Sequence, residues 1–189
     1  SPPSAGPEDA AVALVVFSDY LCPACRGAAE TIAVLREHYE GRSLRIVMRE
    51  FPLDFHGTVA ALAAEASLEA HAQGRFWEMH DALFAAQGNL LDRTSVDRVA
   101  ESAGLDMEAY RAAMDERRWR TAVEADVALG GETLLSGTPT FFLDGKQWMV
   151  DWSRPETCIG LLDEALRAAA SAAEPEPVSE SESEPEPEL

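Results

Sequence analysis

The chain has 189 residues, is 47% hydrophobic and carries a formal net charge of −19. It is long enough for one domain, or one domain with a large insertion, around a buried core. The acidic excess disfavours nucleic acids and anionic membranes as partners, and no stretch reaches the roughly 20 apolar residues of a membrane span. Residues 1–10 are rich in proline and serine and predict a linker-like N-terminus.

The first regular elements predict a strand, a helix and a second strand. A run of apolar, mostly β-branched residues indicates a buried strand over 11–17. Apolar positions then recur at a helical period to about His38, and Gly41 supplies a left-handed cap. Alternating apolar and arginine side chains indicate a second strand over 43–50. Residues 11–56 are therefore expected to form a βαβ unit with parallel, right-handed pairing.

Two cysteines, Cys22 and Cys25, lie where the first strand gives way to the helix. Pro23 suits the first helical turn, where its missing N–H needs no partner. This places Cys22 at the helix N-terminus, pointing outward, and Cys25 one turn in, on the inward face. Partial positive charge and free N–H groups at a helix N-terminus favour a thiolate. The pair predicts thiol–disulfide exchange, and Arg26 either adds positive charge or is simply solvated.

The long region that follows predicts four helices in succession. Four helices between two strands exceed an ordinary connection, so residues 57–130 are expected to form an inserted helical subdomain. The helices are expected over 58–73, from Phe76 to about 87, from Ser95 to about 103, and from Asp106 in one long helix that includes Val123 and Val127.

The chain then returns to strands and ends in a helix, which predicts a second part of the sheet domain over 131–173. Beyond it, residues 174–189 contain seven glutamates and no basic residue. Self-repulsion and the lack of apolar side chains predict a disordered acidic tail. The elements expected before the tail are a strand at 140–143, a two-residue turn at Asp144-Gly145, an antiparallel strand at 147–150 and a helix opened by Pro155.

The cysteine pattern leaves two further features to interpret, the third cysteine and a possible metal site. Cys158 lies on the apolar face of the last helix, where a buried, unreactive thiol is expected. Cys22 and Cys25 could be half of a zinc site, but zinc takes about four ligands and there is no second CxxC or close histidine pair. We expect no metal, and no cofactor beyond a redox-active Cys22–Cys25 disulfide.

Pro139 stands directly before a predicted strand and has no N–H to give to the ladder. From the local sequence alone, a trans proline at the strand margin is the expectation. A cis peptide in a tight turn also fits the pattern.

Taken in this order, the motifs resemble the thioredoxin superfamily, and the helical insertion resembles its DsbA-like branch. The resemblance covers about residues 11–170 and leaves out both ends. Each motif alone is weak, whereas all of them in this order are specific. They are Phe17–Tyr20 with the cysteines that follow, Phe51–Leu53 after the second strand, Gln73–Phe84 in the helical region and Gly137–Gly145 late in the chain.

The resemblance implies an α/β thioredoxin fold, a mixed central sheet flanked by helices and interrupted by the helical subdomain. It implies that Cys22 is the nucleophile and Cys25 the resolving cysteine. It also implies that Pro139 is cis and packs against the disulfide, and that the backbone of Thr138 hydrogen-bonds an extended substrate. The Pro23-Ala24 dipeptide differs from the Pro-His of the best-known strong oxidases, which implies a milder oxidant.

One position departs from the family pattern. Many thioredoxin-like proteins carry a buried acid six residues before the first cysteine, and this chain has Val16 there. Proton transfer to and from the buried thiol is then left to water or to another acid. Asp19 and Glu50 are the candidates, and both could instead be exposed at strand ends. His56 is expected to be a loop or capping residue, or to approach the rim of the site.

The sequence therefore predicts a DsbA-like thiol:disulfide oxidoreductase that oxidises protein dithiols. A periplasmic or other extracytoplasmic location is expected because disulfides persist there, and the linker-like N-terminus is consistent with a removed signal or a former anchor. Expected partners are reduced or unfolded proteins and a membrane or soluble redox partner that restores the disulfide. A disulfide reductase or isomerase with the same cysteines, and a non-catalytic binding module or holdase, remain as alternatives.

Overall fold

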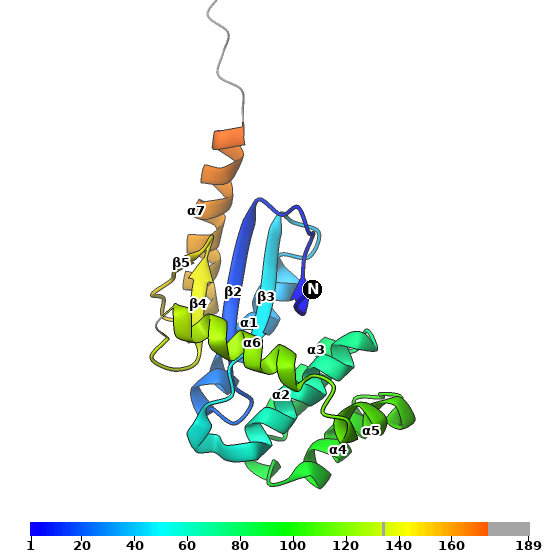
Figure 1. Ribbon diagram of the computed structural model, residues 1–189. Coiled ribbons are helices and arrows are strands. Elements are labelled where there is room, and N and C mark those ends of the chain that lie inside the picture. Colours follow the sequence, from blue (N-terminus) through cyan, green and yellow to red (C-terminus); the bar gives the residue numbers. More distant parts are fainter. Residues whose placement is uncertain (134, 174–189) are drawn as a thin grey trace, which may run out of the picture.

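The computed structural model describes residues 1–133 and 135–173, and its centre is a five-stranded mixed sheet (Figure 1). The strands lie in the order β1-β3-β2-β4-β5. β2 and β3 run parallel, while the other neighbouring pairs are antiparallel. The strands are β1 (Ser4–Ala5), β2 (Val12–Ser18), β3 (Leu44–Glu50), β4 (Thr140–Leu143) and β5 (Lys146–Gln147).

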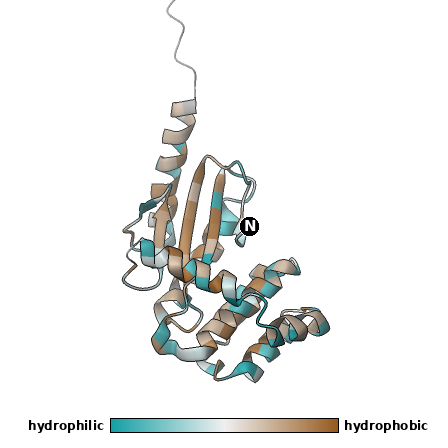
Figure 2. Ribbon diagram, in the orientation of Figure 1, coloured by the Kyte–Doolittle hydropathy of each residue, from teal (hydrophilic) through white to brown (hydrophobic). Residues whose placement is uncertain are grey.

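Two helices, α1 (Pro23–His38) and α7 (Pro155–Ala173), pack on one face of the sheet. Alternate residues of β2 face these helices because successive strand side chains point to opposite faces. The opposite face is crossed by α6 (Arg120–Glu132), which contacts β3 (Figure 1). In Figure 2 hydrophobic residues run along β2, whereas β3 alternates hydrophobic residues with hydrophilic ones, which include its two arginines. The shared core includes Leu14 and Val16 of β2, Ile32 and Leu35 of α1, and Leu162 of α7.

Between β3 and β4 the chain forms a group of helices around α2, which contacts α3, α4, α5 and α6. Short 3-10 turns, η1 and η2, lie before α2 and after α3. Asp92 begins α4 with a capping box, and Asp106 caps α5. The bounds are η1 (Asp54–His56), α2 (Gly57–Ala72), α3 (Phe76–Ala85), η2 (Gln87–Asn89), α4 (Arg93–Ser102) and α5 (Met107–Asp115).

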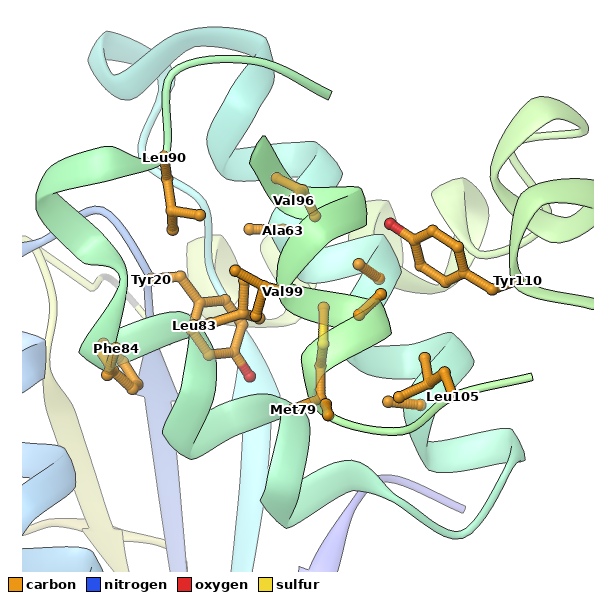
Figure 3. Close-up of a cluster of buried hydrophobic side chains, with 14 of the residues drawn as sticks. Tyr20, Ala63, Met79, Leu83, Phe84, Leu90, Val96, Val99, Leu105 and Tyr110 are labelled. Atoms are coloured by element: carbon orange, nitrogen blue, oxygen red, sulfur yellow. The ribbon is translucent and has the colours of Figure 1, made fainter. Parts of the chain in front are cut away.

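The core of this helical group extends to the cysteines. Tyr20, in the loop after β2, is buried against Phe84 of α3, with ring centroids 4.9 Å apart (Figure 3). Leu90, just beyond η2, belongs to the same cluster, as do Cys22 and Cys25. The helical group therefore packs directly against the loop that carries the cysteines.

The predicted mixed central sheet flanked by helices is confirmed. The βαβ unit is also present, because β2 and β3 pair in parallel from Val12↔Leu44 to Ser18↔Glu50. The first helix ends at His38, and Gly41 has the positive φ of +71° that a left-handed cap requires.

The prediction of one long helix after Asp106 is wrong, because the chain turns between α5 and α6. Arg117 adopts a φ of +52°, a left-handed conformation that is uncommon for a residue with a side chain. The Arg118 N–H bonds the Ala113 carbonyl and the Arg117 N–H bonds the Met114 carbonyl, which closes α5 in a Schellman arrangement. The Arg117 side chain pairs with the buried Glu65. No glycine or proline occurs at this turn, so the helical period in the sequence shows no sign that the helix ends there.

The last strand is shorter than predicted, and β5 ends at Gln147 rather than near Val150. One further bond runs from the Trp148 N–H to the Phe141 carbonyl. In this register the ladder then approaches Pro139, which has no N–H to donate, so the pairing stops.

The N-terminal residues are more than a linker, because Ser4–Ala5 forms β1 along the outer edge of β3. The Met48 N–H donates to the Pro3 carbonyl at 2.9 Å. Gly6 has a φ of +90°, and a Cβ there would meet the Leu44 carbonyl oxygen at 2.0 Å. Only glycine permits that close approach. The proline- and serine-rich composition concealed this two-residue strand.

No helix in the described part of the chain combines the length and apolar character needed to cross a membrane. The predicted acidic tail, 174–189, lies outside the described residues.

Candidate active site

The two cysteines occupy the start of α1. Cys22 is the N-cap residue, with extended backbone, and Pro23 begins the helix. The Arg26 N–H donates to the Cys22 carbonyl, which places Cys25 one turn along on the buried face. Both are free thiols in this structure. Cys22 is 7% exposed, so it is more covered than its predicted outward orientation suggested.

The segment that covers Cys22 comes from 116 residues later in the chain. The Cys22 thiol donates to the Thr138 carbonyl at 3.4 Å, and the Thr138–Pro139 peptide bond is cis. This segment leads into β4, which pairs antiparallel with β2, the strand that precedes the cysteines. The sheet therefore brings together Cys22, Thr138 and Pro139, which sequence reasoning placed in one site.

The environment of Cys25 disfavours its ionisation. Burial raises the pKa of its thiol to about 12, because a thiolate there would lose its contact with water. The Asp19 N–H donates to Cys25 Sγ at 3.5 Å and offsets part of that rise. The Thr138 hydroxyl also lies beside the thiol and lowers its pKa, although among the described residues Thr138 Oγ1 has no hydrogen-bond partner of good geometry. Cys25 is thus held as a neutral thiol at ordinary pH.

Asp19 joins the cysteine loop to the loop after β3. Its side chain is fully buried, which excludes the alternative of an exposed carboxylate. Oδ1 accepts from the Leu21 N–H at 2.8 Å, and Oδ2 accepts from the Leu53 N–H at 2.8 Å. Oδ2 also lies 2.7 Å from Nδ1 of His56, so His56 reaches the site through Asp19. The carboxylate is therefore satisfied by three donors from two loops.

Replacing Asp19 with alanine should lower the free energy of unfolding by roughly 3 kcal/mol, because three largely buried donors would lose their acceptor. Urea unfolding of the reduced protein measures this. Asp115→Ala is the control, since Asp115 is 75% exposed in its side chain and makes one long ion pair with Arg93. Equal stability changes in the two variants would contradict the role assigned to Asp19.

Glu50, the other candidate acid, is also buried rather than exposed, with 3% of its surface accessible. Its Oε1 accepts from Ser67 Oγ at 2.7 Å and from the Tyr20 hydroxyl at 3.4 Å. Burial raises the pKa of this carboxyl to about 8; Asp126 and Asp19 add to the rise, and Ser67 opposes it. Neither Glu50 nor the Asp19 carboxylate makes a hydrogen bond to a cysteine thiol within the described part of the chain. Cys25 is instead reached through the Asp19 amide.

Sequence reasoning missed Gln87, at the start of η2. Its side-chain amide donates to the Tyr20 carbonyl at 2.8 Å and to the Cys22 carbonyl at 2.9 Å. A single glutamine in a polar turn carries no local signal for this role. Only the packing of the helical group against the cysteine loop brings it into contact.

The remaining predicted residues divide between the rim and the core. Pro23 and Arg26 are exposed and Ala24 is half-buried, so these three line the outer side of the cysteine motif. Cys158 is 1% exposed in the core between the sheet and α7, as expected for a buried thiol. Across the described residues, no group of three or more metal-ligating side chains comes together.

A cavity of about 240 Å³ lies beside the cis-proline segment. It is lined by that segment on one side and by the chain leaving β5 on the other, including Trp148, Met149 and Trp152. Met149 is 86% exposed. The side chains of Trp148, Met149 and Trp152 therefore lie across this cavity from Thr138 and Pro139.

This fold and this pairing of a helix-start CxxC with a late proline segment define a thioredoxin-type domain carrying a helical insertion. A family model described as Thioredoxin matches residues 1–164. The chain therefore belongs to the thioredoxin family. It shares its fold with solved proteins that include DsbA-type thiol–disulfide exchange proteins.

Three solved structures illustrate the likeness. A thioredoxin-like oxidoreductase from Silicibacter pomeroyi is 28% identical, with a TM-score of 0.70 over 90% of this chain and 93% of its own. Oxidised BdbD from Bacillus subtilis is 23% identical, with a TM-score of 0.75 over 88% and 93%. The thiol-disulfide exchange protein alpha-DsbA2 from Wolbachia pipientis is 18% identical, with a TM-score of 0.75 over 86% of each chain.

The curated relatives are longer proteins. The chain is 38% identical over 142 residues to Na(+)/H(+) antiporter NhaA 3 of Salinispora tropica, which covers 75% of this chain and 21% of the antiporter. It is 37% identical to the NhaA antiporter of Herminiimonas arsenicoxydans, covering 75% and 22%. The chain thus spans about a fifth of the length of these two relatives.

Proposed function

We propose that the chain is a thiol:disulfide oxidoreductase that oxidises protein dithiols through a Cys22–Cys25 disulfide. The observation that carries the proposal is the geometry of the pair. Cys22 is the N-cap of α1 with its sulfur against the Thr138 carbonyl, and Cys25 is buried one turn behind it. This arrangement offers one sulfur for attack and keeps the other as an internal leaving group.

In the proposed reaction a substrate thiolate attacks the Cys22 sulfur of the Cys22–Cys25 disulfide. The sulfur–sulfur bond breaks, a mixed disulfide forms at Cys22, and Cys25 leaves as a thiolate that takes up a proton. A second substrate thiolate then attacks the substrate sulfur of the mixed disulfide and releases Cys22. The substrate gains a disulfide and the protein becomes the dithiol, so two electrons pass from substrate to protein.

Reduction or isomerisation with the same cysteines is the alternative. The Cys25 pKa, which burial raises to about 12, affects both directions, because the Cys25 thiolate leaves in the oxidation and attacks in the reduction. The reduction potential of the pair therefore distinguishes the two.

The partners and location follow from this chemistry. We expect reduced or unfolded proteins as substrates, with Thr138 and Pro139 binding an extended segment, and a redox partner that reoxidises the pair. An extracytoplasmic setting fits, because disulfides persist there. The match to a short section of the NhaA antiporters supports a further proposal, that such a domain also works attached to or beside a membrane transporter.

The reduction potential tests the direction of the reaction. We expect a value between about −270 mV, as in thioredoxin, and about −120 mV, as in DsbA. Without a histidine in the Pro23-Ala24 dipeptide, less thiolate stabilisation is expected than in the strongest oxidases. Equilibration with glutathione buffers measures the potential in a Cys158→Ser background, which leaves only the active pair. A potential at or below that of thioredoxin would favour the reductase alternative.

A further inference from the structure

The loop that carries Cys22 is held by a side chain from the helical group. Both amide N–H groups of Gln87 are used, one on the Tyr20 carbonyl at 2.8 Å and one on the Cys22 carbonyl at 2.9 Å. The Cys22 carbonyl also accepts the Arg26 N–H, the first hydrogen bond of α1. Gln87 therefore binds the residue at which the loop becomes the helix.

Gln87 is itself fixed in place. It begins η2, in which the Asn89 N–H bonds the Ala86 carbonyl at 2.7 Å and the Leu90 N–H bonds the Gln87 carbonyl. Leu90 is 5% exposed and packs in the same hydrophobic cluster as Tyr20 (Figure 3). Cys22 also belongs to that cluster. Gln87 is thus held by η2 through its backbone and by the cysteine loop through its side-chain amide. A shift of the helical group would therefore move the cysteine loop with it.

We propose that Gln87 is a positioning residue of the disulfide site, which holds the Cys22 loop so that the Cys22 and Cys25 sulfurs meet. The inference rests on the proposed function. The covalent pair forms by an intramolecular reaction, and its efficiency depends on how closely the two sulfurs are held in register. Without Gln87 the loop between Tyr20 and Cys22 gains freedom, and the effective concentration of one thiol at the other falls.

The test follows the resolution of a defined mixed disulfide. Oxidised glutathione forms a disulfide with Cys22 and releases one glutathione thiolate. The Cys25 thiolate then attacks the Cys22 sulfur, forms the Cys22–Cys25 bond and releases the second glutathione. Loss of two hydrogen bonds predicts about a tenfold slower second step in Gln87→Met, and about a tenfold lower effective concentration at equilibrium. Methionine keeps the length of the side chain and removes both donors.

The matched control is Gln73→Met. Gln73 also joins two segments through its amide, accepting from the Asp106 N–H and donating to the Asp106 carbonyl, but it lies between α2 and α5. We expect this variant to lose stability and to keep the wild-type resolution rate. Equal resolution rates in Gln87→Met and wild type, or equal slowing in both variants, would overturn the positioning role.

Two further observations test the role of Gln87 separately from the folding of the variants and from the proposed function. In the wild type the Gln87 side-chain amide protons should exchange slowly and shift between the oxidised and reduced forms, and rapid exchange would contradict the proposal even if the variants failed to fold. If the wild type forms no Cys22–Cys25 disulfide with glutathione, the proposed function itself fails. A wild type that reacts normally, beside an unaltered Gln87→Met, rejects only the role of Gln87.

Discussion

Replacing Cys22 with serine is expected to reduce disulfide transfer to a reduced, unfolded protein by several orders of magnitude, to the uncatalysed background. The Cys22 sulfur, at the helix start, contacts the Thr138 carbonyl, whereas Cys25 is 0% exposed and is held as a neutral thiol. A hydroxyl at position 22 can neither form the mixed disulfide nor act as a thiolate. Reactivation of a reduced disulfide-containing substrate measures the loss.

Two control variants separate the cysteines. Cys158→Ser should keep full activity, because Cys158 is buried against the sheet and contacts neither active cysteine. Cys25→Ser should instead accumulate the mixed disulfide at Cys22, because the resolving sulfur is gone. If Cys22→Ser retained activity on reduced, unfolded substrates, a non-catalytic binding module or holdase would explain the protein better than an oxidoreductase.

Replacing Glu50 with glutamine is expected to remove a large part of the pH dependence of stability. Burial raises the pKa of Glu50 from 4.5 to about 8. Between these values the folded state keeps a proton that the unfolded state has lost, so the stability contributed by the neutral carboxyl is present below 4.5 and lost as the pH rises towards 8. The loss should be on the order of a few kcal/mol. Glutamine is neutral throughout, so the variant should be the more stable protein above pH 8.

Urea unfolding of the oxidised form across this pH range measures the effect without a contribution from the Cys25 thiol. The groups that face Glu50 are Tyr20, Ser67, Asp126 and Asp19. Ser67→Ala is the informative control, because the Ser67 hydrogen bond lowers the Glu50 pKa and its removal should extend the loss of stability to higher pH. An unchanged pH profile in Glu50→Gln would show that Glu50 is ionised in the folded protein.

The protonated carboxyl of Glu50 is relevant to proton transfer at the site. Val16, which is buried within β2, occupies the position where many thioredoxin-like proteins have an acid. Glu50 holds a proton near neutral pH and contacts Tyr20, two residues before Cys22. Among the described residues, the contact of Asp19 with Cys25 is made by its backbone N–H. A proton path from either acid to Cys25 therefore needs an intermediate group, and water remains the alternative that the sequence suggested.

Much of the site was predictable because its signals are local. The change from a strand period to a helical period around Cys22 places the cysteine pair, and Pro23 marks the first helical turn. The turn at Asp144-Gly145 is equally local. In contrast, the break between α5 and α6 depends on Arg117 pairing with the buried Glu65, a contact between residues 52 positions apart. No window of sequence contains that information.

The reactive chemistry of this protein can be predicted from its sequence: a cysteine pair at a helix start, an apolar strand before it and a proline segment that opens a later strand. Which groups surround that chemistry depends on the tertiary packing. Burial of Asp19 and Glu50 and the hydrogen bonds of Gln87 depend on how the helical group packs against the cysteine loop. The physical reason is that periodicity reports which face of an element is apolar, whereas desolvation and hydrogen bonding depend on what covers that face.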